Sequence, residues 1–339
     1  MRNTSNSWGK NMVSAEQLKE DLPIWEKTSE QIKKHRETIK NILDGKDQRM
    51  IVIAGPCSMD YEKPLLEFWK KLKALQDQCS DKIILVMRTY ESKPRTTTGC
   101  KWMIQWWELW NETNLYNWLY TSRSTMKKIA ELNIPIANEI LYPHLMPYFD
   151  DLVSYQAIWA RSSENQQHKE AAASSNTPVG IKNQTHWQVE TTANSLIAAR
   201  SKQPVFIPGF EEITEGNPYS HIILRWYLDW NQSISNINDT YIESILRILN
   251  KKQLGTKFLV DLNHDNSWKN PDLQKNNMEK ALTLNNLSLI VGFMIEAYLK
   301  KGNTKNYSKQ ENTEWVSSTD PCSSFEELKD MIQTLYNNL

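Results

Sequence analysis

Short runs of apolar and β-branched residues alternate with longer amphipathic stretches from Met50 onward. Each run has the length of one strand and each intervening stretch has room for a helix, the pattern typical of a parallel sheet. The runs cover residues 50–57, 83–90, 134–140, 157–161, 178–183, 221–225, 256–264 and 289–297. Eight such units predict a closed (β/α)8 barrel, an α/β fold of the TIM-barrel class. An open doubly wound sheet is the alternative, but no glycine-rich nucleotide-binding motif follows any run.

The polar segment 1–48 precedes the first run and is predicted to be an N-terminal extension with a regulatory or oligomeric role. Within it, residues 25–45 have helical spacing that ends on Gly45, a residue typical of helix C-termini. Residues 49–339 would then form the barrel. A polar loop is predicted over about residues 300–321, and residues 323–339 are predicted to form the closing helix.

The charge of the chain is balanced, with 40 basic and 40 acidic side chains. Nothing in this balance favours a nucleic acid or an anionic membrane as partner. No apolar run reaches the roughly 20 residues of a membrane span, and the polar start lacks the apolar core of a signal peptide. We therefore expect a cytoplasmic protein, and any anion-binding site must be local.

Reactive side chains stand at the ends of the eight runs. They are Cys57, Arg88, Glu139, Arg161, Lys182, Arg225, His264 and Glu296. In a barrel these ends meet at one mouth, where active sites lie. Guanidinium groups match phosphate and carboxylate geometry, so the cations of this set predict a site for an anion that carries both groups. The structural alternative is that each cation pairs with a carboxylate of the barrel.

Cys57, His264 and Glu296, with Asp320 from the last loop, offer sulfur, nitrogen and oxygen donors of the kind that hold a borderline divalent metal. Spacing alone leaves open that the cysteine only packs in the buried core and that the histidine is a polar residue with its hydrogen bonds satisfied.

The loop ESKPRTTTGCK at 91–101 groups basic residues and threonines. It is interpreted as a second phosphate-binding loop, with a solvated basic turn as the alternative.

The motifs GPCSMD, VMRTYESKPRTTTG, PVGIKN, HIILR, DLNHDNS and STDP resemble, in this order, those of type I 3-deoxy-D-arabino-heptulosonate 7-phosphate (DAHP) synthases, from about residue 20 to the C-terminus. The resemblance implies condensation of phosphoenolpyruvate with erythrose 4-phosphate, the first step of the shikimate route to aromatic amino acids. It also implies one divalent metal ion (Mn, Fe, Zn or Co), no organic cofactor, and a homo-oligomer, either a dimer or a tetramer.

The resemblance assigns the substrate-binding residues as follows. Arg161 and Arg225 would hold the phosphate of phosphoenolpyruvate. Its carboxylate and reacting end would lie among Arg88, Lys93 and Lys182, in a pocket ordered by Glu139. The sugar phosphate would bind to Arg95 and Thr96.

The metal ligands implied by the resemblance are Cys57, His264, Glu296 and Asp320, and the catalytic residues are Arg88, Lys93, Lys182 and His264. Two alternatives remain. Lys182 could serve as the Schiff-base lysine of a metal-free aldolase. The chain could also be a catalytically inactive barrel that acts as a regulatory or binding subunit.

Feedback inhibition by aromatic amino acids in relatives depends on the N-terminal extension and on a hairpin before the sixth strand. Here the corresponding region, 205–220, is several residues shorter than expected. An aromatic amino acid effector is therefore a possible partner, and which one inhibits is left open.

Tryptophan is abundant, with 14 residues, and glycine is scarce, with 10 residues, about 3% against a usual 7%. Seven tryptophans stand where the family usually has glycine: Trp102, Trp118, Trp159, Trp187, Trp226, Trp268 and Trp315. The chain could have decayed, could have repacked around the indoles, or could come from a genome that reads UGA as glycine. We favour UGA recoding because the expected cations and metal ligands are intact.

Overall fold

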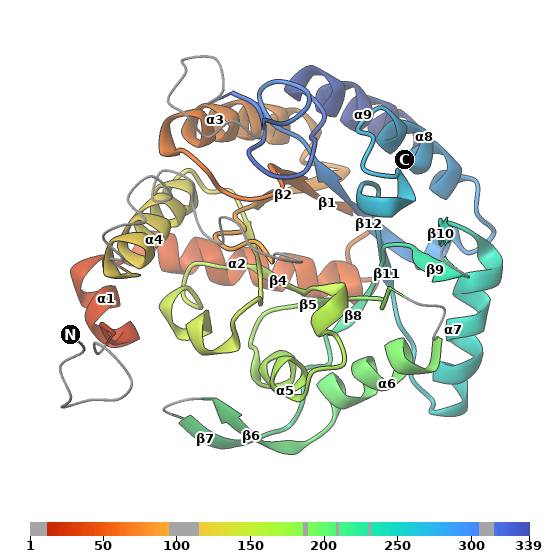
Figure 1. Cartoon of the computed structure of the whole chain (residues 1–339), viewed down its shortest axis with the longest axis horizontal. Coiled ribbons are helices and arrows are strands. Elements are labelled where there is room, and N and C mark those ends of the chain that lie inside the picture. Colours follow the sequence, from red (N-terminus) through yellow and green to blue (C-terminus); the bar gives the residue numbers. More distant parts are fainter. Residues whose placement is uncertain (1–11, 95–114, 186–188, 208–209, 230–231, 305–314) are drawn as a thin grey trace, which may run out of the picture.

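The computed structural model describes residues 12–94, 115–185, 189–207, 210–229, 232–304 and 315–339 (Figure 1). Eight parallel strands close into a barrel in the order β1-β12-β11-β8-β5-β4-β3-β2. They are β1 (Met50–Gly55), β2 (Ile83–Arg88), β3 (Ile136–Glu139), β4 (Tyr155–Ile158), β5 (Val179–Lys182), β8 (His221–Leu224), β11 (Phe258–Asp261) and β12 (Ile290–Glu296). Each predicted run overlaps one of these strands, which confirms the barrel.

Helices surround the barrel (Figure 1). They are α3 (Glu62–Cys79), α4 (Leu115–Glu131), α5 (Gln166–Ser174), α6 (Val189–Arg200), α7 (Asp239–Lys251), α8 (Leu273–Leu282) and α9 (Phe325–Asn338). Alternate strand residues point inward and outward: Ile51 and Ile53 belong to the inner cluster, and Val52 packs in the outer one. Because both sides of each strand are buried, the strands appear in the sequence as continuous apolar runs.

Two helices precede the barrel, α1 (Ala15–Asp21) and α2 (Glu26–Leu43). The second ends where the sequence predicts, and Gly45 just beyond it has a φ of 74°. Ile39 and Ile42 of α2 pack with Ile51 and Val291, which lie near the starts of β1 and β12. Helix α2 therefore closes the N-terminal end of the barrel, and Figure 1 shows it running across that end.

The segments between strands carry further elements. The hairpin of β6 (Gln203–Ile207) and β7 (Phe210–Thr214) occupies the region where a short hairpin is expected. A second hairpin, β9 (Tyr227–Asp229) with β10 (Gln232–Ile234), follows β8 and is not predicted by the sequence pattern. The described part of these segments also contains short 3-10 helices: η2 (Pro143–Tyr148), η3 (Ala160–Ser162), η4 (His264–Asn266) and η5 (Leu287–Leu289). Within the described residues, every helix is too short or too polar to cross a bilayer.

His221, the first residue of β8, is buried inside the barrel near its N-terminal end. The Nδ1 of His221 is 3.0 Å from the carbonyl oxygen of Tyr219, which only accepts, so Nδ1 carries the proton and Nε2 accepts from the Tyr155 hydroxyl at 2.9 Å. Burial lowers the pKa of His221 to about 4. The unfolded chain takes up a proton on this residue near its ordinary pKa of about 6.5, whereas the folded chain does not until about pH 4.

This difference predicts that the free energy of unfolding falls as the pH drops. Between about pH 7.5 and about pH 5, His221 should account for a loss of about 2 kcal/mol. Urea unfolding at both pH values measures the loss, and His221→Gln should show a smaller one. The matched control is His144→Gln, whose histidine is only partly buried. An unchanged pH dependence in His221→Gln would contradict the assignment.

Candidate active site

The predicted site residues that the structure describes lie at the C-terminal mouth of the barrel. Arg88, Glu139, Lys182 and Glu296 are the last residues of their strands, β2, β3, β5 and β12. Cys57, Arg161, Arg225 and His264 lie one to three residues beyond the ends of β1, β4, β8 and β11. Lys93 and Asp320 join them from loops. Arg95 and Thr96 lie outside the described residues.

Three of the four predicted metal ligands form a compact cluster. The ligand atoms of Cys57, Glu296 and Asp320 all lie within 4.8 Å of one another. The fourth, His264, has its Nε2 3.7 Å from Oε1 of Glu296. Its Nδ1 lies 2.8 Å from Oδ2 of the buried Asp261. The nearby carboxylate favours a proton on Nδ1, which leaves Nε2 as the nitrogen available to a ligand.

Cations balance these acidic groups. Lys93 Nζ lies 2.5 Å from Cys57 Sγ and 3.0 Å from Asp320 Oδ2, and Lys269 Nζ lies 3.0 Å from Asp320 Oδ1. Burial of Asp320 opposes its charge, but the two lysines outweigh this effect and lower its pKa. Burial, followed by the charge of Glu296, raises the pKa of Cys57 to about 12, while Lys93 acts in the opposite direction. A metal would have to displace the thiol proton on binding.

A second group of charges lies beside the cluster. Arg88 Nη2 is 3.0 Å from Glu296 Oε1, and Lys182 Nζ is 3.1 Å from Glu139 Oε1, with all four side chains buried. The ring of Tyr90 lies under both cations, 4.1 Å from Arg88 Cζ and 5.6 Å from Lys182 Nζ. For these two cations the carboxylate pairing that the sequence left as an alternative does occur.

The guanidinium groups of Arg161 and Arg225 differ from that of Arg88 in their surroundings. Arg225 is buried, and within the described part of the chain it has no ion pair and its Nε has no hydrogen-bond partner. Arg161 is exposed; partial burial and the charge of Arg225 lower its pKa. Two neighbouring guanidiniums are a suitable site for a doubly charged anion.

Asn183 holds the backbone beside Arg225. Its Oδ1 accepts from the backbone N–H of Arg225 at 2.7 Å, and its Nδ2 donates to the carbonyl oxygen of Trp226 at 2.7 Å. Trp226 has a φ of 125°, and Trp268 in the loop after β11 has a φ of 50°. A side chain larger than glycine costs on the order of 1–3 kcal/mol in such conformations.

Sequence reasoning missed Asp261, Asn183, Tyr90 and Lys269. The first is three residues before His264 and the second directly follows Lys182, so both could have been found as polar neighbours of predicted site residues. Tyr90 and Lys269 carry no such signal, because their roles depend on contacts between segments far apart in the chain.

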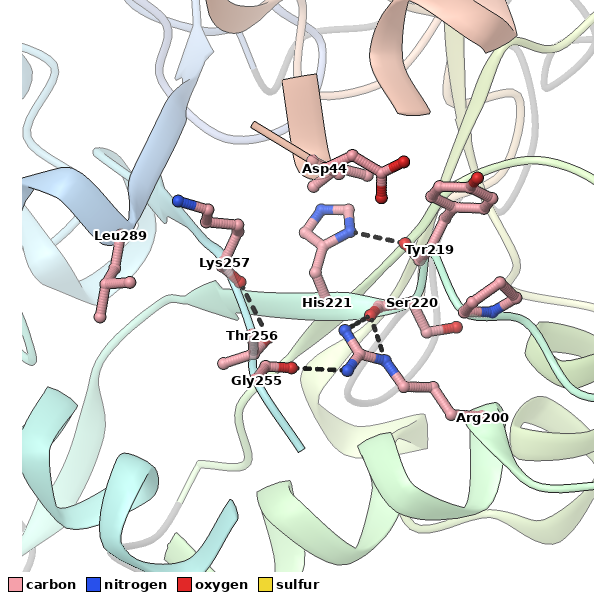
Figure 2. Close-up of a pocket in the computed structure, with 11 residues that line it drawn as sticks. Asp44, Arg200, Tyr219, Ser220, His221, Gly255, Thr256, Lys257 and Leu289 are labelled. Atoms are coloured by element: carbon pink, nitrogen blue, oxygen red, sulfur yellow. Dashed lines mark hydrogen bonds between the residues drawn. The ribbon is translucent and has the colours of Figure 1, made fainter. Parts of the chain in front are cut away.

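A cavity of about 400 Å³ lies at the opposite end of the barrel (Figure 2). Arg200 donates there to the carbonyl oxygens of Ser220 and Gly255, and Lys257 and Asp44 complete its charged lining. None of the predicted site residues borders this cavity. In barrels of this kind the N-terminal face serves stability and the C-terminal face serves chemistry.

A barrel whose mouth combines a thiol, imidazole and carboxylate cluster with several arginines and lysines is of the class that binds phosphorylated anions beside a metal. The sequence model of the DAHP synthetase I family matches residues 12–334, and the chain belongs to this family. The resemblance noted from the motifs is thereby confirmed.

Individual relatives agree along almost the full length. The chain is 32% identical over 339 residues to the Tyr-sensitive phospho-2-dehydro-3-deoxyheptonate aldolase of Escherichia coli (strain K12), covering 97% of this chain and 93% of that protein. It is 31% identical over 331 residues to the Trp-sensitive enzyme of that strain, with 96% and 94% covered. The solved phospho-2-dehydro-3-deoxyheptonate aldolase of Francisella tularensis SCHU S4 superposes with a TM-score of 0.89 at 30% identity, covering 98% of each chain.

The contact between Asp261 and His264 predicts an effect on metal binding. Replacing Asp261 by Asn should weaken the binding of a divalent metal about 10–100-fold, because the imidazole loses the carboxylate that orients it. Calorimetric titration with Mn²⁺ or Zn²⁺ measures this. Asp77→Asn, at an exposed helix position, should keep the original affinity. If Asp261→Asn remains folded by circular dichroism and binds metal as before, the carboxylate has no such role.

Proposed function

We propose that this protein condenses phosphoenolpyruvate with erythrose 4-phosphate and water, and releases DAHP and inorganic phosphate. Membership in the DAHP synthetase I family supports the reaction. The observation that carries it to this chain is the mouth of the barrel, where a cluster of metal-ligand types adjoins arginines and lysines from four other segments.

Phosphoenolpyruvate presents a phosphate at one end and a carboxylate at the other. Arg161 and Arg225 suit the phosphate, since the two guanidiniums lie near each other and Arg225 has no carboxylate partner within the described residues. Lys182, held by Glu139, and Arg88 suit the carboxylate and the reacting end. The assignment of the sugar phosphate to Arg95 and Thr96 rests on the family resemblance.

The donor set fits a divalent metal. Cys57, Glu296 and Asp320 lie close enough to share one ion, and the Nε2 of His264 lies 3.7 Å from Oε1 of Glu296. These four residues would hold Mn, Fe, Zn or Co, because a set of sulfur, nitrogen and oxygen donors does not select one of these metals. When bound, the ion supplies Lewis-acid polarisation of the aldehyde.

The side chains of the chain itself position the reactants. The clustered cations hold the enol carbon of phosphoenolpyruvate against the aldehyde carbon, and a carbon–carbon bond forms between them. Lys93, beside Cys57 and Asp320, is placed to donate a proton to the aldehyde oxygen as negative charge develops there. Water adds at C2 of the former enol, and the carbon–oxygen bond to phosphate breaks.

Consumption of phosphoenolpyruvate tests the proposal. We expect consumption that requires both erythrose 4-phosphate and a divalent metal and that stops when a chelator is added. Borohydride should trap no covalent adduct between substrate and protein. Borohydride trapping at Lys182 without metal would favour the Schiff-base aldolase. No consumption under any of these conditions, with the chain as written or with glycine at the seven tryptophan positions, would favour the inactive regulatory barrel.

Arginine variants sharpen this test. Arg225→Lys should reduce kcat/KM for phosphoenolpyruvate about 100-fold, because lysine cannot offer two parallel donors to phosphate. Arg247→Lys, at an exposed position of α7, is the matched control and should keep the original value.

We further propose an aromatic amino acid effector. A pocket of about 230 Å³ lies between α1, η2, the end of α5 and the hairpin β6/β7. Met146, Pro147 and Val205 give it an apolar part, while Glu16 and Asp150 offer carboxylates for an ammonium group. The Tyr-sensitive and Trp-sensitive names of the two relatives support an effector of this class.

Filling this pocket should relieve inhibition. Met146→Trp is expected to raise the concentration of inhibitory amino acid at half-inhibition at least about 10-fold, because a ring in the pocket excludes the effector. Rates measured with phenylalanine, tyrosine and tryptophan, each added separately, test this, and Leu339→Trp at the exposed C-terminus is the control. Equal inhibition of both variants would place the effector elsewhere.

A further inference from the structure

Two tryptophans beside the proposed active site have a positive φ, a backbone conformation that favours glycine. Residue 226 has a φ of 125° and residue 268 a φ of 50°. A side chain with a Cβ rarely adopts a positive φ, and a φ of 125° lies outside even the small left-handed region open to such residues. Trp226 directly follows Arg225, and Trp268 directly precedes Lys269, so both positions adjoin cations of the mouth.

The barrel fixes the conformation at residue 226. The side-chain amide of Asn183 accepts from the backbone N–H of Arg225 and donates to the carbonyl oxygen of Trp226, each at 2.7 Å. On the other side Tyr227 begins β9, which is paired with β10. The chain therefore cannot relax around the indole without giving up these contacts. The backbone conformation at residue 226 is therefore determined by the contacts at the end of the strand and not by the side chain of residue 226.

The indole of Trp226 is also poorly accommodated. It is 6% exposed, and in the part of the chain that the structure describes its Nε1 has no hydrogen-bond partner. Its ring lies 5.2 Å from the Arg225 Cζ, and the ring of Trp159 lies 3.7 Å from the Arg161 Cζ. Each indole thus occupies a face of one of the two guanidiniums proposed to hold the phosphate, where it competes with an anion.

Residue 268 lies in the turn that leads from His264 to Lys269. The backbone N–H of Lys269 donates to the carbonyl oxygen of His264 at 2.6 Å, and its Nζ reaches Asp320. This turn runs through a left-handed residue 268, whose indole is 64% exposed. A large apolar side chain here contributes little packing in a conformation that disfavours it.

The composition of the chain indicates a single cause for the tryptophans in these unfavourable positions. The chain has 14 tryptophans and only 10 glycines, and UGA differs from the tryptophan codon UGG by one base. We propose that residues 226 and 268, and with them residue 159, are glycine in the functional protein, encoded by UGA codons that its own cells read as glycine. The backbone argument concerns residues 226 and 268 and is independent of the proposed function. Residue 159 has a φ of −69°, so its assignment rests on the composition and on its contact with Arg161. The competition of the indoles with an anion and the expected gain in activity rest on the proposed function.

The codons and the native protein test the assignment directly. We expect UGA at positions 226, 268 and 159, and peptides from the native source that contain glycine there by tandem mass spectrometry. A UGG codon at position 226 or 268, or a native peptide with tryptophan at either, would overturn the proposal.

Stability gives a second test that needs no activity. Trp226→Gly should raise the midpoint of thermal unfolding by about 3 °C, because it removes the backbone strain of a φ of 125°. The matched control, Trp69→Gly, empties a fully buried site in the middle of α3 and should lower the midpoint. A fall in the midpoint of Trp226→Gly comparable to that of the control would refute the assignment.

Activity separates this inference from the proposed function. The triple variant Trp159→Gly, Trp226→Gly and Trp268→Gly should consume phosphoenolpyruvate at least about 100-fold faster than the chain as written, when erythrose 4-phosphate and metal are present. Full activity of the chain as written, with no gain in the variant, would overturn the proposal. UGA codons and a stabilised but inactive triple variant would uphold the glycine assignment and refute the proposed reaction.

Discussion

The mouth of this barrel depends on the pairing of buried charges. Arg88 with Glu296 and Lys182 with Glu139 are fully desolvated pairs, and Lys93 lies between a thiol and a carboxylate. A buried ion that loses its partner costs several kcal/mol, on the order of 3–5. Arg88 and Lys182 are therefore each held in place by an acid at the end of another strand, and this part of the site follows from the closure of the barrel.

The two ends of the barrel differ in their role: the N-terminal end contributes to stability, and the C-terminal end carries the reactive side chains. At the N-terminal end, Ile39 and Ile42 of α2 close the interior, and Arg200 is bonded to backbone carbonyl oxygens. At the C-terminal end, polar and charged side chains replace the apolar interior. Strands that are buried on both sides and closed at one end leave only the other end to receive a substrate.

The sequence predicts the barrel well, because burial on both sides produces continuous apolar runs whose ends are easily seen. It places β4 two residues late, since the buried Gln156 interrupts the apolar pattern and is satisfied by Ser175 and Thr177. Tyr90 and Lys269 could not be assigned, because their partners lie on segments far apart in the chain. The short hairpin of β9 and β10 has too few residues to show an alternating pattern.

Asn183 has a consequence for which molecules can fit. Its backbone continues from Lys182, while its side chain accepts from the backbone N–H of Arg225 and donates to the carbonyl oxygen of Trp226. The ammonium and guanidinium that would receive the two ends of a dianionic ligand thus share one amide as their common anchor. The separation of the two binding groups is set by this short, rigid connection, so the site selects ligands by the length between their two charged ends.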